Sequence, residues 1–199
     1  MTRKCIGIAA WLFATVLGLQ AQGFEISPFY GYRFGGSVAT SDGQDSQLEA
    51  GPAYGLSLNY VQRDSDLRLA VFWSHQDSGL DLDGAGGLDH VDMLVDEFLI
   101  GGFYEYGQGR LHETVTALVG ATVFSPDAGD VEARLSFSVG VGVKYYLWKN
   151  FALQADLRGY CTVVESEGAF ISSGGHTVAY FSGSAIWQGE VSGGITWSF

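Results

Sequence analysis

The stretch LSFSVGVGVKY, residues 135–145, alternates strictly between two kinds of side chain. Leucine, phenylalanine, valine and tyrosine occupy the odd positions, and serine, glycine and one lysine occupy the even ones. Because successive side chains of a β-strand point to opposite faces, this period of two predicts a strand with one apolar face and one small, polar face. A helix is excluded here, since its apolar positions would recur every three or four residues.

The same alternation recurs along the rest of the chain in segments of about ten residues, close to the length that a tilted strand needs to cross a bilayer. The predicted strands are 24–34, 52–61, 67–74, 93–106, 114–124, 135–145, 151–160 and 187–199. Short polar turns at 62–66, 107–110 and 148–150 alternate with longer connections at 35–51, 77–92, 125–133 and 164–184. This arrangement predicts an all-β fold, an eight-stranded antiparallel up-and-down barrel that crosses a membrane.

The N-terminal residues have the features of a secretory signal peptide. Arg3 and Lys4 precede an apolar stretch at 6–19, and Ala21 or Gly23 offers a small residue for cleavage. We therefore expect residues 1–23 to be removed and residues 24–199 to form the barrel. The signal peptide would take Cys5 with it, so the remaining Cys161 could form no internal disulfide.

Acidic residues dominate the charge of the chain. The formal net charge is −12, which argues against nucleic acid as a partner. Most of these acids lie in the four longer connections: Asp42, Asp45, Glu49, Asp77, Asp81, Asp83, Asp89, Asp92, Asp127, Asp130, Glu132, Glu165 and Glu167. Carboxylate oxygens suit Ca²⁺ or Mg²⁺, so divalent cations are possible partners, but no complete metal-binding motif is present and no cofactor is expected.

The two strand faces allow two kinds of barrel. A soluble, lipocalin-like binder would turn its apolar face inward, whereas a membrane barrel turns it outward to lipid. Aromatic residues near the strand ends favour the membrane barrel, because such rings gather at membrane interfaces. These aromatic residues are Tyr60, Trp73, Tyr104, Tyr145, Trp148, Trp187 and Trp197.

Charges of both signs lie on the small, polar face. Inside a narrow barrel they would pair into a network that plugs the lumen. The predicted network consists of Glu25, Arg33, Arg68, Glu97, Glu105, Lys144, Asp156, Arg158 and Glu190.

Three stretches resemble the OmpA-like and OmpX-like superfamily of outer-membrane barrels. Residues 28–36 resemble its first strand, and residues 139–146 with 152–160 resemble its last periplasmic hairpin. The C-terminal alternation of Ile195, Trp197 and Phe199 resembles the signal that the barrel-assembly machinery reads in such proteins. The resemblance implies a bacterial outer-membrane location and contact with lipid and lipopolysaccharide. The short turns follow the second, fourth and sixth predicted strands, so these turns and both termini are expected on the periplasmic side.

The sequence predicts a non-enzymatic outer-membrane protein with a role in surface interaction or envelope integrity. A small-solute or ion channel is the first alternative. A lipid A-modifying enzyme is less favoured, because Ser74 and His75 are neighbours on one strand and so point to opposite faces. Asp77 and Ser78 lie close by, but the His-x-Ser spacing of the lipid A deacylase barrels is absent.

Overall fold

A computed structural model describes residues 23–40, 45–61, 66–81, 90–127, 130–163, 169–173, 176–180 and 185–199. The predicted signal peptide up to Gln22 and most of the predicted turn at 62–66 lie outside these residues. The described residues form twelve strands. They are β1 (Phe24–Gly35), β2 (Ser37–Thr40), β3 (Asp45–Gln47), β4 (Gly51–Val61), β5 (Leu67–Asp81), β6 (His90–Gln108), β7 (Leu111–Pro126), β8 (Glu132–Trp148), β9 (Phe151–Val163), β10 (Ala169–Ser173), β11 (His176–Tyr180) and β12 (Ala185–Ser198).

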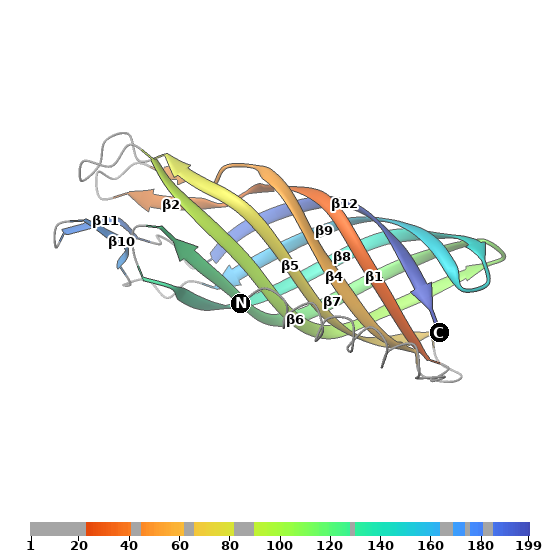
Figure 1. Cartoon of the computed structure of the whole chain (residues 1–199). Helices are drawn as coiled ribbons and strands as arrows, with labels where there is room; N and C mark the ends of the chain where they lie inside the picture. Colours follow the sequence, from red (N-terminus) through yellow and green to blue (C-terminus); the bar gives the residue numbers. More distant parts are fainter. Residues whose placement is uncertain are drawn as a thin grey trace, which may run out of the picture.

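Eight of these strands close into a barrel, which confirms the predicted fold (Figure 1). Its strand order is β1-β12-β9-β8-β7-β6-β5-β4, and every neighbouring pair is antiparallel. The first and last barrel strands pair with each other, so the barrel has no open edge. Among the described residues, no helix is long and apolar enough to cross a membrane.

The two ends of the barrel differ. At the turn end lie the tight turns that join β6 to β7 and β8 to β9, together with Phe24 and Phe199. At the loop end lie the last residue of β5 and the first residue of β6, Asp81 and His90.

Gly23 lies at the turn end of the seam, by which we mean the place where β1 pairs with β12 on one side and β4 on the other. Its N–H donates to the Phe199 carbonyl at 3.3 Å, and its carbonyl accepts from the Val61 N–H at 2.5 Å. Its φ of 127° is disfavoured for other residues, and an added Cβ would lie 2.9 Å from the Val61 oxygen. The residue therefore joins β1 to both of its neighbours.

The structure corrects the predicted connections at the loop end. The expected loop at 77–92 is partly strand, because β5 continues to Asp81 and pairs there with β6 from His90 onward. The expected loops at 35–51 and 164–184 contribute a second sheet of order β10-β11-β2-β3 (Figure 1). These strands escaped prediction because segments such as SVAT and DSQ have no alternating apolar face, and backbone pairing alone defines them.

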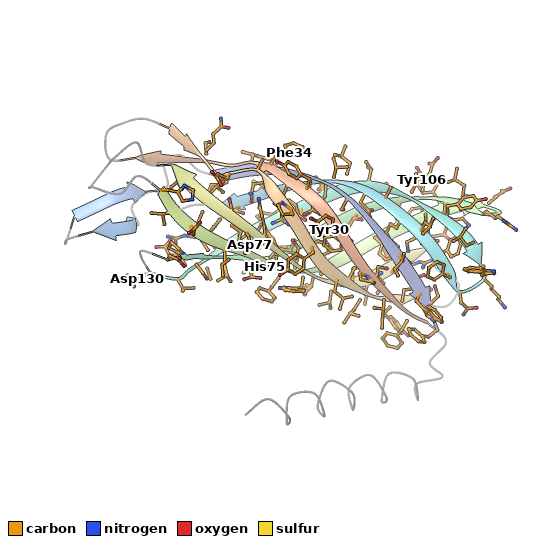
Figure 2. The ribbon with its side chains drawn as sticks, turned by 45° about the horizontal axis from the view of Figure 1, so that its top comes forward. Tyr30, Phe34, His75, Asp77, Tyr106 and Asp130 are labelled. Carbon is orange, nitrogen blue, oxygen red and sulfur yellow. The ribbon has the colours of Figure 1, made fainter. Side chains whose placement is uncertain are left out.

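The barrel strands turn their apolar side chains outward, as predicted for a membrane barrel. In β8, Val139 is 66% exposed and Val141 is 54% exposed, whereas the alternate residue Lys144 is 1% exposed. Figure 2 shows the outward side chains along the wall between Tyr106 near the turn end and Asp130 near the loop end. A soluble binder with its apolar faces inside does not fit this orientation.

Candidate functional site

The structure places the nine charged residues of the predicted network inside the barrel. Seven of them are buried: Glu25, Arg33, Glu97, Glu105, Lys144, Arg158 and Glu190. Arg68 and Asp156 point inward as well but are less completely enclosed. Alternation along each strand puts these groups on the inner wall, and the stagger of the strands decides which of them meet.

Arg33 organises a cluster toward the loop end. Its Nε and Nη2 donate to Glu190 Oε2 at 3.1 and 2.8 Å, and its Nη1 lies 3.7 Å from Glu97 Oε1. Nη2 also donates to the Ser74 hydroxyl, and the guanidinium lies 4.2 Å from the centre of the Tyr160 ring. Arg33, Glu97 and Glu190 are all completely buried, so one cation serves two carboxylates away from bulk water.

Two uncharged side chains complete this loop-end cluster. The Tyr160 hydroxyl donates to Glu190 Oε2 at 3.1 Å, and the Thr122 hydroxyl donates to Glu97 Oε2 at 2.9 Å. Each buried carboxylate therefore accepts a hydrogen bond from an uncharged hydroxyl group in addition to its contact with Arg33. Such supporting donors lower the cost of burying charge.

A second cluster lies toward the turn end and pairs two carboxylates with two cations. Lys144 Nζ donates to Glu25 Oε2 and Glu105 Oε2, each at 3.0 Å. Arg68 reaches the same two carboxylates, with Nη1 at Glu25 Oε1 and Nη2 3.1 Å from Glu105 Oε1. The formal charges of these four groups cancel, so the cluster forms a balanced ionic plug.

The turn-end cluster also recruits residues that the sequence analysis did not single out. The Tyr146 hydroxyl donates to Glu105 Oε1 at 2.8 Å, and His112 Nδ1 lies 2.9 Å from the same oxygen. The Ser198 hydroxyl donates to Glu25 Oε1 at 3.1 Å. All three lie on the inner parity of their strands, so strand alternation was the signal that could have found them.

Between the two ionic clusters, apolar side chains fill the lumen. The buried members of this group are Ala70, Phe72, Leu99, Phe103, Leu118 and Tyr160, and Phe29 packs against them. The rings of Phe29 and Phe72 stack with their centres 5.2 Å apart. At this level the lumen therefore departs from the predicted small, polar inner face, because large apolar side chains lie among the polar ones.

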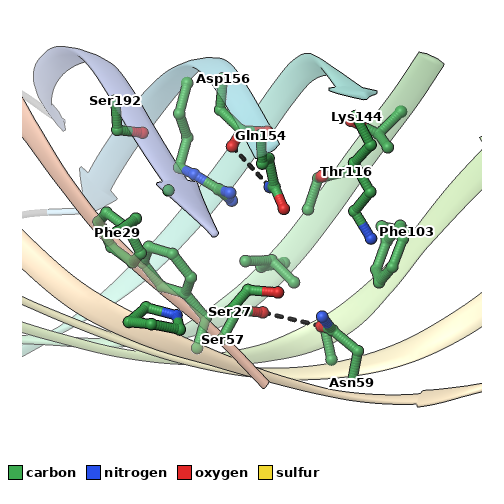
Figure 3. Close-up of a pocket in the computed structure, with 17 residues that line it drawn as sticks. Ser27, Phe29, Ser57, Asn59, Phe103, Thr116, Lys144, Gln154, Asp156 and Ser192 are labelled. Carbon is green, nitrogen blue, oxygen red and sulfur yellow. Dashed lines mark hydrogen bonds between the residues drawn. The ribbon is translucent and has the colours of Figure 1, made fainter. Parts of the chain in front are cut away.

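Arg158 and Asp156, two members of the predicted network, lie in this middle layer. Asp156 Oδ2 accepts from Gln154 Nε2 at 2.6 Å (Figure 3). The Arg158 guanidinium lies 4.4 Å from the centre of the Phe72 ring. Among the described residues, Arg158 Nε and Nη1 have no hydrogen-bond partner. The close contact shown for Arg158 is thus a cation–π interaction with Phe72.

The middle layer leaves one small internal cavity of about 30 Å³. Ser27, Thr116 and Lys144 are among its lining residues (Figure 3). This space suits one or two ordered water molecules, which would serve the unpaired polar atoms, and it is too small for a solute. The two ionic clusters and the apolar side chains between them therefore fill most of the lumen.

The structure separates the residues of the hydrolase alternative. Ser74 points into the lumen and contacts Arg33, whereas His75 lies on the outer wall with its Nδ1 2.9 Å from Asp96 Oδ1. Asp77 is 3.4 Å from His75 Nε2, and the Ser78 hydroxyl donates to the Glu49 carbonyl. None of these contacts places a hydroxyl group where His75 could activate it as a nucleophile.

The predicted acidic connections are only partly described. Glu49, Asp77, Asp92, Asp127, Asp130 and Glu132 are described, Asp45 and Asp81 lie in β3 and at the end of β5, and Asp42, Asp83, Asp89, Glu165 and Glu167 lie outside the described residues. Within the described part of the chain, no three His, Cys, Asp or Glu side chains gather as a metal site would require. The prediction of divalent cations at the loops stays a prediction.

The three residues of the C-terminal alternation lie in or next to the closing strand. Ile195 and Trp197 point outward from β12, at 43% and 54% exposure. The Trp197 ring packs edge-on against Phe151, with ring centres 6.1 Å apart, and Phe199 donates its N–H to the Phe24 carbonyl. The last strand thus presents an apolar outer face beside the seam.

Solved structures of several bacterial barrels share this architecture. Neisserial surface protein A (NspA) aligns with a TM-score of 0.62 and 18% identity, over 89% of this chain and 97% of NspA. The chain has the fold of outer-membrane β-barrels. The outer membrane protease OmpT from Escherichia coli aligns at 0.54 with 8% identity over 90% and 98% of the two chains, and AlkL in lipid bilayers aligns at 0.51 with 14% identity over 89% and 90%.

These similarities concern the fold alone, because all three identities are below 20%. No protein-family model matches the chain, and no curated protein matches it. The geometry of the chain's own residues must therefore carry any functional proposal.

Proposed function

We propose that this chain is a non-enzymatic bacterial outer-membrane protein with a plugged lumen, which acts in surface interaction or in envelope integrity. The observation that carries the proposal is the inverted wall, with apolar side chains outside and paired charges inside. In water, a barrel with such a wall would expose its apolar outer surface to solvent. In a bilayer, the same surface lies against lipid chains, which stabilises the barrel there. The signal-peptide features of residues 1–23 support export from the cytoplasm.

The loop end is the part of the molecule suited to contact with the surroundings. Among the described residues at this end, the acidic side chains of Asp77, Asp92 and Asp130 are exposed. Lipopolysaccharide phosphates bridged by divalent cations, or basic groups on another surface, are the partners that such charges favour. Assembly into the membrane would use the barrel-assembly machinery, which reads a terminal strand like the one ending at Phe199.

The filled lumen supports a structural role over a channel. Two completely or nearly buried ionic clusters and an intervening apolar layer leave a cavity of only about 30 Å³. An enzyme is disfavoured because Ser74 and His75 lie on opposite sides of the wall. OmpT is a protease with a similar fold, but the fold supports many functions and transfers none by itself.

The proposal is tested by fractionating native envelopes and running the barrel unheated and heated on a detergent gel. We expect recovery with the outer membrane and a folded band whose mobility changes on boiling. Recovery in the soluble periplasm would refute the proposal. Conductance in planar bilayers would reveal a channel, and a changed mass of lipid A after expression would reveal an enzyme; we expect neither.

A further inference from the structure

Two tight turns lie next to each other at the turn end and border one groove of about 440 Å³. Residues 109–110 join β6 to β7, and residues 149–150 join β8 to β9. The turns are adjacent because β7 and β8 are paired strands. The Tyr146 N–H donates to the Arg110 carbonyl at 2.8 Å, so the backbone holds the first turn against the end of β8.

Each turn contributes one exposed cation to this space, which we call the basic groove. Arg110 comes from the first turn and Lys149 from the second. Aromatic rings line the groove as well: the His112 and Tyr146 rings lie edge-on with their centres 4.9 Å apart, and Trp148 is 69% exposed. The basic groove therefore offers two cations beside an aromatic surface.

The two cations of the basic groove differ from the other lysines and arginines that the structure describes. Most of the others point into the lumen: Arg33, Arg68, Lys144 and Arg158. Arg134, outside the lumen network, pairs with Glu132. Within the described part of the chain, no acidic side chain pairs with Arg110 or Lys149. Both cations therefore remain available for a partner from outside the molecule.

The exposed acids near this end already have partners of their own. The Tyr104 hydroxyl donates to Asp66 Oδ2 at 3.0 Å, and the Tyr106 hydroxyl donates to the Glu113 carboxylate. The buried Glu105 is held by the turn-end cluster. An external anion is therefore the partner that the unpaired cations of the basic groove attract.

The basic groove is continuous with the lipid-facing wall. Leu111, Tyr145 and Trp148 lie on the outer side of β7 and β8, and each is more than 40% exposed. Figure 2 labels Tyr106 on the same part of the wall. Tyrosine and tryptophan gather at the level of lipid head groups, so the two cations lie at that level and hydrocarbon begins beside them. A molecule with a charged head and apolar chains fits this surface better than a soluble anion does.

We propose that the basic groove binds the phosphodiester of an anionic phospholipid, such as phosphatidylglycerol. The Arg110 guanidinium can donate two parallel hydrogen bonds to phosphate oxygens, and the Lys149 ammonium adds a second positive charge. The acyl chains would lie along Leu111 and Tyr145. The turn end is expected on the periplasmic side, where the outer membrane presents phospholipids rather than lipopolysaccharide. The inference rests on the proposed function, since only a membrane-embedded barrel meets such lipids.

The test measures which lipids remain bound to the full barrel in native mass spectrometry. The probes are phosphatidylglycerol and phosphatidylcholine with the same acyl chains, because the choline of the second lipid cancels the charge of its phosphate. EDTA is present throughout, so that divalent cations cannot bridge the lipid to acidic side chains. We expect about threefold or greater retention of phosphatidylglycerol, the size of effect that accessible ion pairs support. Equal retention of the two lipids would overturn the proposal.

A second arm separates a lipid from a free phosphate. Glycerol 3-phosphate, which carries a phosphate without acyl chains, is added at the same concentration as the lipid. We expect it to leave the retained phosphatidylglycerol unchanged, because the lipid also contacts the apolar wall. Displacement of the lipid by glycerol 3-phosphate would overturn the phospholipid as the occupant.

Variants assign the preference to the basic groove. Arg110→Gln and Lys149→Gln lie in exposed turns, so both should fold, and each should lower the preference by about twofold. The double variant should retain the two lipids nearly equally. Arg134→Gln removes one positive charge outside the groove, so it is the matched control and should keep the full preference. A full preference in the double variant, or an equal loss in Arg134→Gln, would overturn the proposal.

Failure of this inference can be separated from failure of the proposed function. The heat-dependent gel shift of each preparation reports whether the barrel has folded and inserted. A preparation that never inserts contradicts the proposed function. An inserted barrel without lipid preference contradicts only the role of the basic groove.

Discussion

Arg33→Met removes the cation at the centre of the loop-end cluster and leaves two completely buried carboxylates, Glu97 and Glu190, without their positive partner. The change deletes two donated hydrogen bonds to Glu190, one to Ser74, and the contact with the Tyr160 ring. Breaking a buried ion pair by removing one partner costs about 3–5 kcal/mol. We expect the free energy of unfolding to fall by an amount in this range.

The measurement is urea-induced unfolding of the barrel in lipid vesicles, followed by tryptophan fluorescence and by the heat-dependent gel shift. The triple variant Arg33→Met, Glu97→Gln, Glu190→Gln removes the charges together, and we expect it to recover most of the loss, to within about 2 kcal/mol of the parent. Arg134→Met, which breaks a partly exposed pair with Glu132, should cost about 1 kcal/mol or less.

Two results would refute the reasoning. One is an Arg33→Met barrel as stable as the parent, which would mean that water or a nearby group already neutralises the carboxylates. The other is a triple variant less stable than the single variant, which would mean that hydrogen-bond geometry matters more here than uncompensated charge.

Three further predictions concern the seam, the outer wall and the inner wall. The sequence offers signal cleavage at Ala21 or at Gly23, and the bonds of Gly23 to both strands beside β1 favour Ala21 over the expected removal of residues 1–23. Intact-mass measurement of the mature protein should therefore show that Gly23 is retained, and a chain beginning at Phe24 would contradict this. Val141→Lys, on the lipid-facing wall, should destabilise the barrel in vesicles by about 2–4 kcal/mol, whereas Val131→Lys, outside the barrel strands, should have little effect; equal losses would contradict the assigned orientation. Gly120→Ala, on the inner wall, should lower the urea midpoint, since a Cβ would lie 2.0 Å from the Phe98 oxygen. Gly159→Ala, on the outward face of β9 with its nearest atom 3.9 Å away, should be tolerated, and the reverse order would contradict the packing of the wall.

The sequence was most informative where the two faces of a strand differ sharply. In β8 the valines at 139, 141 and 143 alternate with serine, glycine and lysine, and this contrast predicted the strand and its two faces. The choice of which face meets lipid needed a further signal, the aromatic residues near the strand ends. The barrel follows from eight such segments, because antiparallel strands with a lipid-facing side must close. The fold therefore depends on a local property that one sequence displays.

Partners inside the barrel could not be predicted in the same way. Lys144 meets Glu25, which is 119 residues away, because of the stagger of strands around the barrel. Phe72 lies on the inner parity of β5, yet its residue type gave no indication that it would stack on Phe29 and separate two ionic clusters. Contacts across a lumen are set by barrel geometry, which alternation along one strand does not encode.

Closure of the barrel through β1 and β12 has a consequence for how the chain acquires its structure. Ser27 bonds to Thr196 across 169 residues, and Ser198 bonds to Glu25 across 173. Contacts this distant along the chain give a high contact order, which slows folding because the connecting chain must first be ordered. The first strand therefore waits for the last to be synthesised and delivered, and until then its exposed edge needs protection from other chains.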